Sequence, residues 1–303
     1  MDNEHHLSPT PFPMRILGGN NMSQGVAGIY SEIYTRLASN KTLFPALPET
    51  TIRIRQTFNE PGCTIASAAK LLNTDPGLSA FILRIANSVR FMSLFPPKDL
   101  ESALRRIGLT NTMELATTFA VKAAFATSSM ALKELMLDSY RQATKVAVIS
   151  YFLTAKVSKL NPSKAMLAGL LQDIGLPLIL LQLSERPEIF NDRKRRIQAV
   201  DHLAPMVGAL ILNHWGFSKE LIEVVRSRKQ WMRDSGDKAD LGDLLQIARI
   251  HALIGREEFF DCPALIDLPA YSKLPCGKLA PNQSLEILEE AKDELAELQL
   301  MFG

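Results

Sequence analysis

Leu167-Ala168-Gly169-Leu170-Leu171-Gln172-Asp173-Ile174-Gly175 (LAGLLQDIG) is an apolar run with one polar pair, Gln172-Asp173, in its middle. A carboxylate among leucines costs several kcal/mol unless it is paired, bonded to donors or bound to a metal. Asp173 therefore needs a partner. The sequence leaves two explanations open, a metal site or a structural carboxylate that organises a helical binding module.

Composition sets the class of protein. The chain has 303 residues, 47% hydrophobic and 22% charged, which is ordinary for a globular protein with one large or two modest domains. Its net charge of +2 gives no field that argues for nucleic acid or an anionic membrane. Three widely spaced cysteines, no signal-peptide pattern and no uninterrupted apolar run long enough to span a bilayer predict a cytoplasmic protein with reduced thiols.

Helical periodicity extends from the opening stretch in both directions. Asn161-Pro162 is a helix start, and Pro177 is expected to bend or break that helix one turn beyond Asp173. Asp75-Pro76 is a second start of the same kind. Further helices are predicted at about 23–39, 48–59, 64–72, 99–108, 111–126, 131–157, 201–215, 218–225 and 240–255. No alternating strand pattern occurs, so the predicted fold class is all-α.

Five stretches, taken in order, resemble the HDOD family. They are FPALPE from Phe44, DPGLSAFILRIANS from Asp75, ALRRIGL from Ala103, LAGLLQDIG from Leu167 and VGALILNHWGFSKELIEVVRS from Val207. HDOD modules are related to HD-type metal phosphohydrolases and occur in bacterial signalling proteins. The resemblance implies an N-terminal helical bundle packed on a bundle similar to the HD phosphohydrolases.

The resemblance suggests a domain organisation. Residues 1–21 are expected to form a flexible arm, and 22–258 the HDOD domain, with its N-terminal bundle at about 22–130 and its HD-like bundle at 131–258. Residues 259–303 are expected to form a loop, which includes 261–281, followed by an amphipathic helix at 284–302. That helix packs either on its own body or on a second copy of the chain, as in a homodimer.

HD enzymes hold their metal through a histidine, a later His-Asp pair and a downstream acid, and the metal activates a water. The resemblance places the first histidine at Gln142 and the pair at Gln172-Asp173. The acid should fall within Ala248–His251, where no carboxylate occurs. A histidine pair often found in the family is replaced by Ser227-Arg228-Lys229, whose cations repel a metal but would accept an anion.

This altered ligand set predicts that the chain binds no metal and no other cofactor, because an amide is a poorer metal ligand than an imidazole. Gln142 and Gln172 could instead donate N–H groups to Asp173, with Arg141 as a further charge partner. His202, next to Asp201, is either a remnant ligand or a residue bonded within the bundle. The degenerate site therefore comprises Gln142, Gln172, Asp173, Asp201 and His202.

The first functional hypothesis is a non-catalytic signal-transduction module that binds a signalling protein in trans, or a small anionic ligand. Its expected groove lies between the two bundles, close to Asp173 and to Asp75, Arg84, Asn87 and Arg141. The alternative is a metal-dependent phosphohydrolase acting on a nucleotide or cyclic dinucleotide through Asp173, Asp201 and His202. A third hypothesis, nucleic-acid binding through Arg105, Arg106 and Arg193–Arg196, conflicts with the near-neutral charge.

Overall fold

The computed structural model describes residues 28–36, 49–88 and 96–274, and residues 289, 292, 293 and 296 of the C-terminal segment. All regular structure in these residues is helical, which confirms the predicted all-α class. The predicted arm at residues 1–21, the start of the FPALPE stretch and most of the predicted amphipathic helix at 284–302 lie outside the described residues.

Residues 28–36 form a short helix, and the first half of the chain continues with α2 (Glu49–Asn59), α3 (Ile65–Leu72), α4 (Pro76–Ala86), α5 (Leu100–Ile107), α6 (Leu109–Val121) and the 3-10 turn η2 (Lys122–Phe125). The second half contains α7 (Met130–Val157), α8 (Pro162–Leu171), α9 (Leu176–Ser184), α10 (Pro187–Phe190), α11 (Arg193–His214), α12 (Lys219–Arg226), α13 (Leu241–Leu253), η3 (Glu257–Asp261), η4 (Leu265–Asp267) and α14 (Pro269–Ser272). The elements η4 and α14 lie within the segment that was expected to be a loop. Helix α11 begins at Arg193, eight residues before the predicted start at Asp201.

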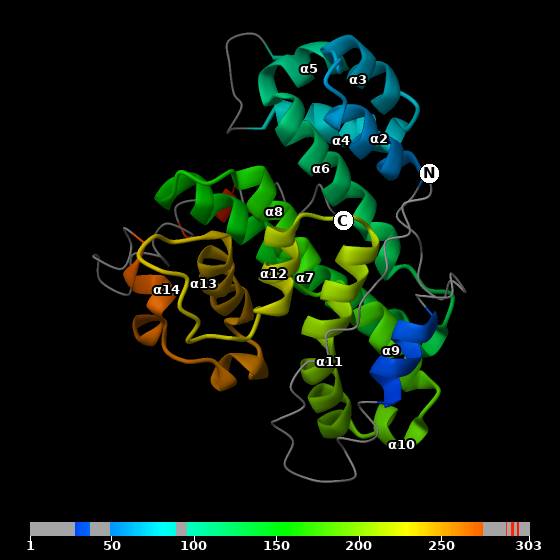
Figure 1. The fold of residues 1–303 in the computed structure, drawn as a ribbon, viewed down its shortest axis with the longest axis vertical. Coiled ribbons are helices and arrows are strands. Elements are labelled where there is room, and N and C mark those ends of the chain that lie inside the picture. Colours follow the sequence, from blue (N-terminus) through cyan, green and yellow to red (C-terminus); the bar gives the residue numbers. More distant parts are fainter. Residues whose placement is uncertain are drawn as a thin grey trace, which may run out of the picture.

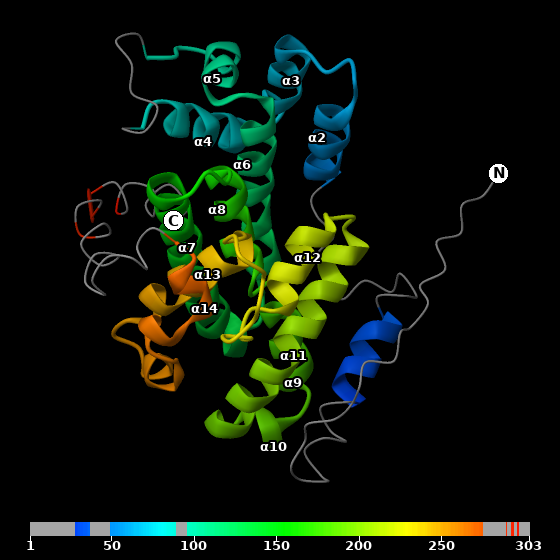
Figure 2. The same ribbon diagram turned by 60° about the vertical axis from the view of Figure 1, so that its left-hand side comes forward.

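Helices α2 to α5 form one end of the molecule, and α6 runs from that end into the body built by the later helices (Figures 1 and 2). The helix at 28–36 instead lies beside α9 and α11, where Glu32 pairs with Arg186 at 2.8 Å. Buried side chains from both halves belong to one hydrophobic core. The division into two bundles near residue 130 therefore stays a prediction.

The predicted helix starts are built by local caps. Asp75 accepts a hydrogen bond from the Leu78 amide at 3.0 Å, and Pro76 takes the first turn of α4. Asn161 and Pro162 do the same for α8, where Asn161 Oδ1 accepts from the Ser163 amide at 2.9 Å. These caps satisfy amides that have no partner inside the helix, so short local patterns fix both starts.

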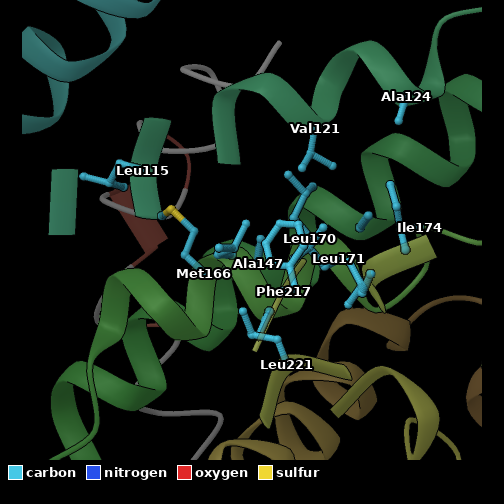
Figure 3. Packing of buried hydrophobic residues seen from close by; sticks show 14 of the residues in the cluster. Leu115, Val121, Ala124, Ala147, Met166, Leu170, Leu171, Ile174, Phe217 and Leu221 are labelled. Carbon is cyan, nitrogen blue, oxygen red and sulfur yellow. The ribbon is translucent and has the colours of Figure 1, made fainter. Parts of the chain in front are cut away.

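Helix α8 is the centre of the body. Residues Ala165 to Leu171 are all buried, and α8 is packed against α6, α7, α12 and α13. Figure 3 shows Leu170 and Leu171 surrounded by side chains from α6, α7 and the α11–α12 connection. A helix that is apolar on all sides must be covered on all sides, which explains its central position. The stretch Pro162–Ser184 is long and apolar enough to cross a membrane, but its most apolar part is 89% buried inside the fold.

The break after α8 differs from the prediction. The helix ends at Leu171, and residues 172–175 form a turn that contains Asp173, whereas the expected break lay one turn later. Pro177 lies in the first turn of α9, where a proline removes no intrahelical hydrogen bond. A Cβ on Gly175 would lie 2.9 Å from the Gly208 amide nitrogen on α11. The turn therefore lets α11 approach the backbone closely, and it places Asp173 at a helix end.

Arg55 of α2 joins the N-terminal end of the molecule to the body. Its guanidinium donates to the carbonyl groups of Trp215 and Gly216 at 3.3 and 3.2 Å and stacks over the Phe217 ring at 3.8 Å. The acceptors are carbonyls at the C-terminal end of α11, where a positive charge is favourable. Burial lowers the pKa of Arg55, and the nearby Glu114 opposes that shift.

We expect Arg55→Ala to lower the free energy of unfolding by about 1–2 kcal/mol, because it removes a cation–π contact and two charged hydrogen bonds. The exposed neighbour Arg53 is the matched control, and Arg53→Ala should cost about 0.5 kcal/mol or less. Urea unfolding of the three proteins measures the difference. Equal losses for both variants would contradict the role given to Arg55.

Candidate functional site

Asp173 lies in the turn between α8 and α9 and is 4% exposed, beside Gln172 at 2%. Both residues come directly after α8, whose residues Ala165 to Leu171 are all buried. A carboxylate at this depth must have a counter-charge or donors close by, as its position in the apolar run predicts.

Two arginines supply the counter-charge. Arg228, just after α12, contacts Asp173 Oδ1 through Nη1, and Arg249 Nη1, on α13, lies 3.3 Å from Asp173 Oδ2. Arg228 Nη1 also lies 3.3 Å from the Gln172 carbonyl, and Arg249 Nη1 donates to Gln172 Oε1 at 3.1 Å. We call these four residues, Gln172, Asp173, Arg228 and Arg249, the arginine clamp. It ties the α8–α9 turn to α12 and α13.

A half-exposed ion pair borders the arginine clamp. Lys229 Nζ lies 2.5 Å from Asp201 Oδ1, and Arg228 Nη2 lies 3.9 Å from the same oxygen. The side chains of Lys229 and Asp201 are 37% and 39% exposed, whereas that of Arg228 is 2% exposed. The neighbouring His202 is exposed. This outer pair therefore connects the buried clamp to solvent.

The cations of the site crowd one another. Burial lowers the pKa of Arg228, and the like charge of Arg249 adds to that effect. Burial also lowers the pKa of Arg249 and of Lys229, while Asp201 opposes both shifts. A guanidinium nevertheless stays protonated in proteins, so both arginines carry a full charge beside Asp173.

The prediction that Gln142 and Gln172 donate hydrogen bonds to Asp173 is wrong. Gln142 Nε2 donates to the Ala252 carbonyl at 3.2 Å and so joins α7 to α13. Gln172 accepts from Arg249 through Oε1 instead of donating to the carboxylate. Within the described residues, Asp173 pairs with Arg228 and Arg249 and not with the exposed Arg141. Charged guanidinium groups bind a carboxylate more strongly than neutral amides do, which explains the different partners.

Arg249 is the residue that the sequence analysis left without a role. The signal was present, because Arg249 is a single arginine in the apolar helix Leu241–Leu253, and such a group needs a buried counter-ion. Arg228 was noted only as a cation in place of a histidine.

The predicted groove residues on α4 have local roles. Asp75 caps α4, and Asn87 Nδ2 donates to the carbonyl groups of Leu83 and Pro97 at 2.9 and 3.3 Å. Arg84 is exposed on the same helix. The groove itself stays a prediction.

The site does not fit a divalent metal ion. Both oxygens of Asp173 are held by guanidinium groups. The positions that the resemblance assigns to histidine ligands carry Gln142 and Gln172, and no carboxylate occurs within Ala248–His251. Among the residues that the structure describes, no group of three or more His, Cys, Asp or Glu side chains could hold a metal. Two fixed positive charges beside the carboxylate would also repel a cation.

We expect Asp173→Asn to lower the free energy of unfolding by about 3–5 kcal/mol, because it removes the buried counter-charge that the two guanidinium groups share. Arg249→Met in the same background should recover part of that loss by removing one of the stranded charges. Urea unfolding measures both effects.

Asp201→Asn is the control, since its half-exposed pair should contribute about 1 kcal/mol or less. A similar small loss for Asp173→Asn would show that the arginine clamp is not a main support of the fold.

Comparisons with known proteins agree with this fold. The family model described as HDOD domain matches residues 44–231. A search of curated proteins found no match. A solved structure of a candidate metal-dependent phosphohydrolase from Shewanella amazonensis SB2B is 23% identical, with a TM-score of 0.74 over 92% of this chain and 100% of that chain.

Two further structures share the fold. An HDOD domain protein of unknown function from Geobacter sulfurreducens is 18% identical, with a TM-score of 0.64 over 91% of this chain and 99% of that chain. A candidate signal transduction protein from Marinobacter aquaeolei VT8 is 20% identical, with a TM-score of 0.61 over 93% of this chain and 66% of that chain. The family match spans more than half of the sequence, and the chain therefore belongs to the HDOD domain family.

Proposed function

We propose that this chain is a non-catalytic regulatory module of bacterial signal transduction, which acts in the cytoplasm by binding a signalling protein in trans. One observation carries the proposal. The carboxylate that remains of an HD-type metal set is occupied by Arg228 and Arg249, so the site is closed by protein cations. Such a site can hold the helices in one arrangement but has no means of activating a water molecule.

The arrangement counts against the alternative of a metal-dependent phosphohydrolase with a rebuilt site. That site would need Asp173, Asp201 and His202 as ligands. Asp173 is bound to two arginines, and Asp201 is bound to Lys229. A metal ion would have to displace the two arginines and Lys229 to reach the two carboxylates. The free energy of that displacement exceeds what binding to the exposed imidazole of His202 would supply.

Most of the basic residues considered for nucleic acid are bonded within the chain. Arg105 lies 3.7 Å from Glu101, Arg106 donates to the Ala86 carbonyl, Arg193 lies 2.7 Å from Glu257, and Arg195 lies 3.5 Å from Asp192. Phosphate recognition needs a field of unneutralised cations. These pairs therefore support a partner other than nucleic acid.

The partner surface that we propose is the groove near Asp75, Arg84, Asn87 and Arg141, of which the two arginines are exposed. Exposed arginines are common anchors of protein interfaces, since they combine charge with a flat apolar face. Association of two copies is a further proposal, and light scattering of the purified chain decides it.

The experiment that tests the absence of catalysis combines elemental analysis with a hydrolysis assay, on protein purified without a chelator or a histidine tag. We expect no stoichiometric iron, manganese or zinc, and no hydrolysis of nucleotides or cyclic dinucleotides with any of these metals added. A stoichiometric metal that is lost in Asp173→Asn, together with hydrolysis, would overturn the proposal.

A ligand-restoring variant provides the matched positive control. Gln142→His, Gln172→His, Arg228→His and Arg249→Asp together return imidazole and carboxylate groups to the site. We expect this variant to bind a metal that the wild-type chain does not bind. Equal metal content in both proteins would show that the arginines do not decide the chemistry.

A further inference from the structure

The arginine clamp contains donors that nothing in the described residues satisfies. Arg228 Nε, Arg249 Nε and Gln172 Nε2 are buried and have no hydrogen-bond partner. The three residues are 5%, 8% and 2% exposed. Buried N–H groups in folded proteins nearly always have an acceptor, so three orphan donors in one cluster indicate a place for acceptor oxygens that the chain does not itself provide.

The site also carries excess positive charge. Its ion pairs join the cations Arg228, Arg249 and Lys229 to only two carboxylates, Asp173 and Asp201. The next acid, Glu258, acts on Arg249 from farther away, but it lies 3.4 Å from Arg256 and is shared with that residue. The buried group is therefore short of one negative charge.

Asp201 already behaves as a tethered anion at the outer edge. Its side chain is 39% exposed, and it contacts Lys229, the most exposed of the three cations, and the buried Arg228. If Asp201 turned out into water, three cations would face Asp173 alone. A dianion would then balance the charge, and a tetrahedral oxyanion has enough oxygens to reach several donors at once.

We propose that Arg228, Arg249 and Lys229 form a binding site for the phosphate group of a small ligand, and that Asp201 is the internal competitor that this phosphate displaces. The inference rests on the proposed function, because it assigns a ligand to the same non-catalytic site. Binding there would change the contacts between α11, which carries Asp201, and the segment after α12, which carries Lys229. The site thereby gains a means of passing a signal to the bundle surface.

Isothermal titration calorimetry of the full chain with inorganic phosphate and with adenosine monophosphate tests the site, at an ionic strength held constant with chloride. We expect phosphate binding to be about tenfold weaker in Lys229→Gln and about tenfold tighter in Asp201→Asn, since each change removes or frees one charged contact. The exposed Lys70 of α3 lies in the other half of the chain, and Lys70→Gln should bind like wild type.

Equal affinity for the two ligands would identify free phosphate as the ligand, and tighter binding of the nucleotide would identify a phosphate ester. An absence of binding in both wild type and Asp201→Asn, or binding that Lys229→Gln leaves unchanged, would overturn the inference. If the phosphate site fails this test but adenosine monophosphate is not hydrolysed, the non-catalytic proposal stays in place. Hydrolysis of adenosine monophosphate would overturn the non-catalytic proposal instead. Both variants alter half-exposed side chains, and circular dichroism verifies that they fold.

Discussion

The ion pairs of Asp173 with Arg228 and Arg249 are the constraint on which the arrangement of the body depends. They connect three segments that are far apart in the sequence, namely the turn after α8, the segment after α12 and α13. Each charge alone would be costly at this depth, so the three segments are stable only when they meet. Apolar packing around α8 brings the segments close, but it is not directional. The charges select one arrangement among those that packing allows.

Much of this could be predicted from local patterns. Asp75-Pro76 and Asn161-Pro162 specify their helix starts because a cap involves residues close in sequence. The need of Asp173 for a partner also followed from its apolar neighbours. The identity of that partner could not be predicted, because Arg249 is 76 residues away in sequence and only the fold brings Arg249 close to Asp173. The break at residues 172–175 was misplaced for a similar reason, since the close approach of Gly175 to α11 is a tertiary contact.

The two arginines beside Asp173 determine what the site can do. A bound metal can be lost, exchanged or left with an open position, whereas a guanidinium is fixed to the chain and always charged. The fold similar to that of a candidate metal-dependent phosphohydrolase therefore contains a donor set that prefers anions over cations. The half-exposed pair of Asp201 and Lys229 is where this preference meets solvent. This preference supports the proposed regulation by a change of shape, with no chemical step.

We propose that Arg228 and Arg249 hold the carboxylate of Asp173 without a metal ion. The most direct test is the urea midpoint of unfolding, measured with a chelator and with excess manganese or zinc. A ligand that binds only the folded state raises its stability by mass action. We expect the same midpoint under all these conditions. A midpoint that falls with the chelator and rises with metal, and that no longer responds in Asp173→Asn, would contradict it.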